Sequence, residues 1–230
     1  MKTYGQFCSV ARALDLLGER WTLLIVRELL CGSRRFGEVQ RGIPRISRTM
    51  LSARLRELSD AGVIERHHGA EGPEYRLTSA GAEVGAVVRD LGTWGQRWLP
   101  REIPPSQLDA GALLWDVHRR VRREALPDKP LVVRIELTDV RGSAGCHYLL
   151  LRSSEVSLCT VNPGFPEELC LRSDRRTLIG WWRGDLSFRQ ARAGGLALEG
   201  RRELVRAFPD WFERYLFAEV TPGTSSPRRG

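Results

Sequence analysis

The segment from Ser47 to Leu58 constrains the fold more than any other part of this chain. Leu51, Leu55 and Leu58 recur at helical spacing, so one side of a helix is expected to pack against a core. Ser47 can cap the start of this helix, and Gly62 is suited to the position after its end. The opposite side is left to Arg48, Thr49, Ser52 and Arg56, with Arg54 at its edge.

Four further helices and a hairpin are expected around this segment. The stretch Trp21–Leu30 is apolar on most of its surface, which places that helix at the centre of a small domain. Helix, short helix, turn, helix and hairpin is the order of elements in a winged helix-turn-helix domain, which we expect over residues 1–100. The expected helices are Ser9–Leu17, Trp21–Leu30, Arg35–Arg41 and Ala80–Trp98, and the expected strands are Val63–His67 and Glu74–Leu77.

In such a domain the helix after the turn can lie in the major groove of DNA, while the hairpin, or wing, contacts the neighbouring backbone. Hydroxyl groups and Arg near the helix start can reach base edges, and other basic side chains can contact phosphates. Any one of these residues taken alone could equally be a solvated surface residue, so the order of elements carries the prediction. The residues predicted to contact double-stranded DNA are Arg35, Ser47, Arg48, Thr49, Ser52, Arg54, Arg56, Arg66, His67 and His68.

A dense set of residues between Cys8 and Gly81 matches one known pattern. It comprises Cys8, Leu16–Ile25, Arg27–Leu29, Gly32, Arg35–Phe36, Ile46–Ser47, Leu51–Ser52, Arg54–Leu58, Ala61–Gly62, Tyr75–Thr78 and Gly81. On these residues the chain resembles the HxlR-type regulators, which are relatives of the MarR group. The resemblance implies a homodimer built through the first and last helices of the domain and a roughly palindromic DNA operator. The wing departs from the pattern, because the segment Pro73–Tyr75 is shorter than the corresponding run in the family.

Cys8 stands where several members of that family carry a cysteine that senses electrophiles or oxidants. A helix N-terminus and Arg12 could lower the pKa of this thiol and favour the reactive thiolate. A free cysteine is also suited to packing in an apolar core, and this alternative stays open. Cys8 is therefore the redox-sensing candidate.

Composition favours a polyanionic partner, because 36 Lys and Arg against 28 Asp and Glu give a net charge of +8. Only Lys2 and Lys129 are lysines, an arginine bias that high-GC coding alone could produce, so the placement of charge decides. No apolar run is long enough for a membrane span and no secretory signal is apparent, so we expect a cytoplasmic protein without membrane association. The five cysteines contain no Cys-x-x-Cys pair, and neither a metal nor a cofactor is expected.

A second domain is expected beyond a proline-rich linker, which makes the chain α+β as a whole. The linker is placed at residues 101–108, the domain at 109–220 and a disordered tail at 221–230, which is rich in Pro, Ser, Gly and Arg. The expected helices are Leu108–Ala125, Asp174–Trp182, Ser187–Ala193 and Arg202–Phe208, and the expected strands are Leu131–Leu137, His147–Arg152 and Val156–Val161.

Residues Asp174–Phe188, Ala191, Gly194–Gly200, Arg202, Leu204–Val205 and Phe208–Phe212 carry a looser resemblance to the sterol-carrier-protein-2-like fold. The resemblance implies a mixed sheet against helices that encloses an apolar cavity. A hydrophobic small-molecule effector that prefers one arrangement of the dimer would shift its affinity for DNA. Aromatic residues in this pattern are also ordinary core residues. The candidates to line the cavity are Trp115, Trp181, Trp182, Phe188, Trp211 and Phe212.

These features predict a DNA-binding transcriptional regulator, acting as a repressor, that is not an enzyme. The chain shows no nucleophile elbow, phosphate-binding glycine loop, metal-ligand spacing or carboxylate pair. Cys146 and His147 are adjacent and would point to opposite faces of a strand, which is a poor geometry for a thiolate–imidazole pair. Two alternatives stay open: an enzyme, or a carrier of lipids or other hydrophobic ligands, using the C-terminal cavity while the winged helix serves only for dimerisation.

Overall fold

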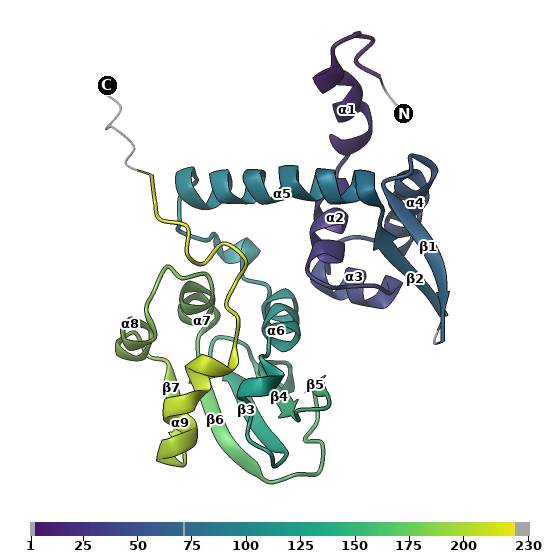
Figure 1. Ribbon diagram of the computed structural model, residues 1–230. Helices are drawn as coiled ribbons and strands as arrows, with labels where there is room; N and C mark the ends of the chain where they lie inside the picture. Colours follow the sequence, from purple (N-terminus) through teal and green to yellow (C-terminus); the bar gives the residue numbers. More distant parts are fainter. Residues whose placement is uncertain (1–2, 71, 224–230) are drawn as a thin grey trace, which may run out of the picture. The chain divides into compact units, whose positions relative to one another are not determined.

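The computed structural model describes residues 3–70 and 72–223 and divides the chain into two compact units, one ending at Gly95 and the other beginning at Gln96 (Figure 1). Both units contain helices and strands, so the chain is α+β. The first unit contains α1 (Ser9–Leu17), α2 (Thr22–Leu30), α3 (Phe36–Gly42), α4 (Arg48–Asp60), β1 (Ile64–Gly69), β2 (Gly72–Leu77) and most of α5 (Ser79–Trp98).

The core of the first unit is built around α2. Ile25, Val26 and Leu29 are at most 1% exposed, and apolar residues of α3, α4, β1 and α5 pack with them. This confirms the expectation that the apolar helix occupies the centre of the domain. The charged residue of α2, Glu28, is also fully buried.

The hairpin follows α4 directly and is tied to the start of α3. β1 and β2 are antiparallel, with His67 opposite Glu74 and His68 opposite Pro73. The N–H of Tyr75 donates a hydrogen bond to the carbonyl oxygen of Arg34 (2.7 Å). Helix, short helix, turn, helix and wing therefore occur in the expected order.

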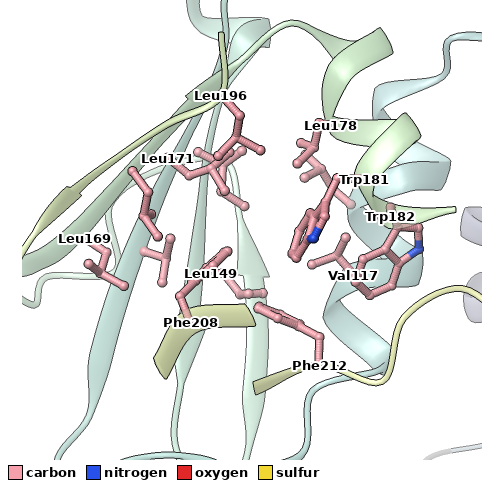
Figure 2. Close-up of a cluster of buried hydrophobic side chains, with 14 of the residues drawn as sticks. Val117, Leu149, Leu169, Leu171, Leu178, Trp181, Trp182, Leu196, Phe208 and Phe212 are labelled. Atoms are coloured by element: carbon pink, nitrogen blue, oxygen red, sulfur yellow. The ribbon is translucent and has the colours of Figure 1, made fainter. Parts of the chain in front are cut away.

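The second unit is a mixed five-stranded sheet packed against helices (Figures 1 and 2). The strand order is β5-β4-β3-β6-β7; β3 and β6 are parallel, and every other neighbouring pair is antiparallel. Alternate residues of β3 belong to the core shared with the helices, whereas Arg134 and Glu136 point to the other face. The elements are α6 (Ala110–Arg119), β3 (Leu131–Leu137), β4 (Cys146–Leu151), β5 (Val156–Cys159), β6 (Glu167–Ser173), α7 (Arg175–Trp182), α8 (Phe188–Ala193), β7 (Ala197–Gly200) and α9 (Arg202–Ala207).

Four elements of this unit differ from the expectation by two residues or more. Strands β6 and β7 were not predicted, and β5 ends at Cys159 rather than Val161. The helix expected to reach Ala125 ends at Arg119, because the backbone that follows it pairs with the segment after α9: the N–H of Arg122 donates to the carbonyl oxygen of Trp211 (2.7 Å).

Part of the tail expected to be disordered, residues 221–223, belongs to the described chain, while residues 224–230 lie outside it. The N–H of Gly223 donates to the carbonyl oxygen of Arg97 (2.9 Å). Within the described ranges, no helix combines the length and the apolar character needed to cross a membrane.

Candidate nucleic-acid interface

α4 exposes a polar face and buries an apolar one. Leu51, Leu55 and Leu58 are at most 2% exposed. Ser47 caps the helix, since its Oγ accepts a hydrogen bond from the N–H of Met50 (3.2 Å). The predicted contact residues Ser47, Arg48, Thr49, Ser52 and Arg56 are all exposed.

An open groove of about 570 Å³ lies along this face and brings four of the predicted residues together. Two further lining residues were missed. Phe36 of α3 is apolar and partly buried against the core, and Ala53 of α4 has no polar group to mark it. Helical spacing from Thr49 would have placed Ala53 on this face. The full lining is Phe36, Arg48, Thr49, Ser52, Ala53 and Arg56.

Arg48 is held in place by two residues of α3. Its guanidinium carbon lies 5.0 Å from the centre of the Phe36 ring, within the range of a cation–π interaction. Its Nη1 donates a hydrogen bond to Oε1 of Gln40 (3.3 Å). α3 therefore orients Arg48, the first residue of α4.

Six predicted residues do not line the groove, namely Arg35, Ser47, Arg54 and the three wing residues Arg66, His67 and His68. Arg54 is 12% exposed and its guanidinium is 2.6 Å from Glu19 and 2.5 Å from Glu57, so its charge is already neutralised within the unit. Arg35 precedes α3, where its backbone forms a β-bridge with Glu74 of the wing.

The wing distributes its three candidate residues over two faces. Successive residues of a strand alternate, so Arg66 and His68 share one face and His67 shares the other with Glu65. His67 Nε2 lies 2.8 Å from Oε1 of Glu65. All three candidates are exposed, but one of them is paired with a carboxylate of the same strand.

Cys8 is exposed and immediately precedes α1. The backbone N–H groups of Ala11 and Val10, in the first helical turn, lower the pKa of the Cys8 thiol below its usual value. The helix N-terminus accounts for the lowering, and Arg12 does not contribute to it.

Five of the six aromatic candidates of the second unit belong to one buried cluster or pack against it, and Figure 2 shows Trp181, Trp182 and Phe212 of this cluster. The ring of Trp181 lies 5.4 Å from that of Phe188 and 6.4 Å from that of Phe212. Trp182 donates its indole N–H to Asp116 (2.7 Å). The sixth, Trp115, lies outside this cluster and stacks on His118. Trp181, Trp182, Trp211 and Phe212 are at most 4% exposed.

A buried leucine stripe, an exposed basic groove and an attached hairpin define the first unit as a winged helix-turn-helix domain. The model of the HxlR-like helix-turn-helix family matches residues 16–103. YvaP of Bacillus subtilis, named as an HTH-type transcriptional regulator, is 40% identical over 101 residues, which are 43% of this chain and 90% of that protein. The chain belongs to the HxlR-like helix-turn-helix family.

Two further proteins are similar to part of this chain. Rv3095 of Mycobacterium tuberculosis, also named as an HTH-type transcriptional regulator, is 49% identical over 104 residues, which are 44% of this chain and 65% of that protein. The chain thus covers slightly less than two thirds of that relative. Among solved structures, the reduced form of the transcriptional regulator YodB from B. subtilis is 36% identical; the match covers 40% of this chain and 93% of that one, with a TM-score of 0.35.

Proposed function

We propose that this protein is a DNA-binding transcriptional regulator that reads the major groove with the exposed face of α4. The observation that carries the proposal is the groove, where two guanidinium and two hydroxyl groups lie on one helix face opposite a buried leucine stripe. Membership of the HxlR-like family supports it, as do the names of the relatives.

The residues divide into base and phosphate contacts. Arg48 contacts a guanine edge, because it stands at the helix start and is already oriented by α3. Arg56, farther along the helix, contacts phosphate. Arg54 does not contact DNA in this arrangement, since its guanidinium is already ion-paired with two carboxylates. Ser47, Thr49 and Ser52 complete the base-reading face, and Arg35, Arg66, His67 and His68 complete the phosphate contacts.

Fluorescence anisotropy with a labelled duplex from the region upstream of the chain's own coding sequence tests the proposal. The parent is expected to bind with an affinity that falls as salt rises, and Arg48→Ala should weaken binding by about tenfold. Arg189→Ala, an exposed arginine of α8 in the second unit, is the matched control and should bind like the parent. Equal binding by the Arg48→Ala and Arg56→Ala variants and the parent would refute the assignment of α4.

We propose that the regulator is a homodimer. α1 buries Ala11 alone and leaves Val10 66% and Leu14 41% exposed, and α5 leaves Leu91 51% and Trp94 54% exposed. Two amphipathic helices of one unit thus present apolar faces that a second copy would cover. A two-fold dimer would also place two copies of α4 on the half-sites of a palindromic operator.

Light scattering of the full chain tests the dimer. The parent should have twice the chain mass of 26.0 kDa, and Leu91→Glu should reduce the mass toward that of one chain while weakening DNA binding. The control is Val161→Glu, at an apolar residue that is 75% exposed in the second unit. A parent of single-chain mass at the concentrations that bind DNA would rule the dimer out.

We further propose that the dimer represses transcription and that a hydrophobic small molecule bound by the second unit modulates it. The mixed sheet packed against helices is the arrangement expected of a sterol-carrier-type domain and supports this proposal. Native mass spectrometry of the purified protein should reveal a bound hydrophobic molecule whose addition changes DNA affinity. A bound molecule that leaves DNA affinity unchanged would favour the alternative of a carrier or an enzyme.

We also propose that Cys8 senses oxidants. Its exposure and the lowered pKa of its thiol support a reactive thiolate. Treatment with hydrogen peroxide should weaken DNA binding by the parent and leave Cys8→Ser unaffected. Equal loss in both proteins would assign the effect to another residue.

A further inference from the structure

The groove on α4 has an apolar part as well as a basic wall. Phe36 and Ala53 line it together with Thr49, whose side chain carries a methyl group. These three residues come from two helices, α3 and α4, and none of them offers a charge to a phosphate. Contacts to the DNA backbone alone would leave this apolar surface facing water.

The basic wall stands next to the apolar part. Arg48 lies over the Phe36 ring and is also bound to Gln40, so its guanidinium is directed before any ligand arrives. An oriented guanidinium matches the two acceptor atoms that guanine presents in the major groove. Thymine is the one standard base that projects a methyl group into the same groove.

We propose that the groove is a specificity pocket for a thymine methyl group beside the guanine contacted by Arg48. The inference rests on the proposed function and specifies which pair of neighbouring bases α4 selects. Phe36, Ala53 and the Thr49 methyl surround the thymine C5-methyl, and Arg48 binds the neighbouring guanine. Removing the methyl group should weaken binding about fourfold, the value expected for exposing one apolar carbon.

Replacing thymine by deoxyuridine removes this methyl group and leaves base pairing unchanged, so it tests the pocket directly. The probe is the shortest duplex recovered when the full chain selects binders from a random-sequence library. Each thymine of that duplex is replaced in turn, and affinity is measured by fluorescence anisotropy. One thymine in each half-site, next to a guanine, should show the fourfold loss.

Two variants connect that loss to the groove. Phe36→Ala should bind the thymine and deoxyuridine duplexes equally. Because Phe36 also packs against the core, Ala53→Gln provides a second test: glutamine is a good helix former that fills the groove with a polar group, and it should abolish the discrimination too. Arg66→Ala is the control, because this exposed wing arginine lies outside the groove; losing its phosphate contact should weaken both duplexes equally and retain the fourfold difference.

The possible failures are distinguishable. If the selected duplex binds the parent but no deoxyuridine replacement changes affinity by more than about 1.5-fold, the pocket is refuted and the DNA-binding function stands. The same holds if Phe36→Ala and Ala53→Gln both keep the full discrimination. If the library yields no bound duplex at any salt concentration, the proposed function itself fails.

Discussion

The carboxylate of Glu28 occupies the space that a side chain at Gly42 would need. A methyl group added at Gly42 would lie 1.9 Å from Oε2 of Glu28 and 2.1 Å from its Cδ. Glu28 is fully buried in α2, where it accepts hydrogen bonds from Arg27 (2.7 Å) and Ser33 (3.3 Å). Arg27 also donates to the carbonyl oxygen of Gly42 (3.1 Å), so this contact joins the central helix to the end of α3.

Gly42→Ala is therefore expected to destabilise the first unit by about 2–4 kcal/mol, because the methyl group must displace a buried, ion-paired carboxylate. Hydrogen exchange of the α2 amides reports the unfolding free energy of this unit separately from the second. In a Glu28→Ala background the space is empty, and the same change at Gly42 should cost less than about 1 kcal/mol. Equal costs in the two backgrounds would contradict the steric explanation.

Substitution of Arg54 should lower the stability of the first unit, whereas substitution of Arg56 should weaken DNA binding, although both residues belong to α4. Arg54→Ala removes two ion pairs of a largely buried guanidinium and should destabilise the first unit by about 1–3 kcal/mol. Arg56→Ala should change stability by less than about 0.5 kcal/mol and lower the slope of log affinity against log salt by about 1. Thermal unfolding and anisotropy at several salt concentrations measure the two effects. A salt slope that falls only in the Arg54→Ala variant would reverse the assignment.

Asp116 should make the second unit sensitive to acid. Burial alone would raise the pKa of this carboxyl, but Arg119, Arg120 and the indole N–H of Trp182 outweigh burial and hold the pKa below its usual value. The folded state thus favours the ionised form, and this stabilisation is fully present at neutral pH and is lost as the pH falls through the folded pKa.

Asp116→Asn should consequently cost about 2–4 kcal/mol at about pH 7 and progressively less toward about pH 3. Hydrogen exchange of the α6 amides at several pH values gives the difference between variant and parent. Glu213→Gln, near the chain end of the same unit, serves as the control. A constant difference at every pH would mean that the charge of Asp116 does not contribute.

Cys8 and Cys170 should be alkylated with different pH dependences. The first turn of α1 lowers the pKa of the Cys8 thiol, whereas burial raises that of Cys170 against the opposing effect of Arg134. Thiolate is the species that reacts, so the iodoacetamide rate at Cys8 should rise at a lower pH than at Cys170. Peptide mass spectrometry after short pulses measures both sites in one sample. Superimposable pH curves would argue against an activated Cys8.

Most helices of this chain follow from local sequence. Ser47, Asp109, Asp174 and Ser187 each accept a hydrogen bond from the first turn of the helix that they precede, and such caps can be recognised from residue type. The strands β6 and β7 could not be found in this way. β6 begins with two glutamates, and β7 is only four residues long. Both form because β3 and β6 offer backbone partners that are distant in sequence.

In the candidate interface, too, some features follow from the local sequence and others from the tertiary structure. The spacing of the leucines determined which face of α4 is buried, because helical periodicity is a local property. Whether each arginine can contact DNA was decided by the tertiary structure. Arg54 is neutralised in part by Glu19, which lies far away in the sequence, and Arg48 is oriented by Phe36 of another helix.

The sequence by itself determined a winged helix-turn-helix order and an exposed helix bearing arginines and hydroxyl groups, since caps, periodicity and turn residues act over a few positions. Only the tertiary structure decided that Phe36 and Ala53 share a groove with Arg48, and that Arg54 does not. Side-chain pairing and burial depend on which helices approach each other, and that approach is set by the packing of the whole unit.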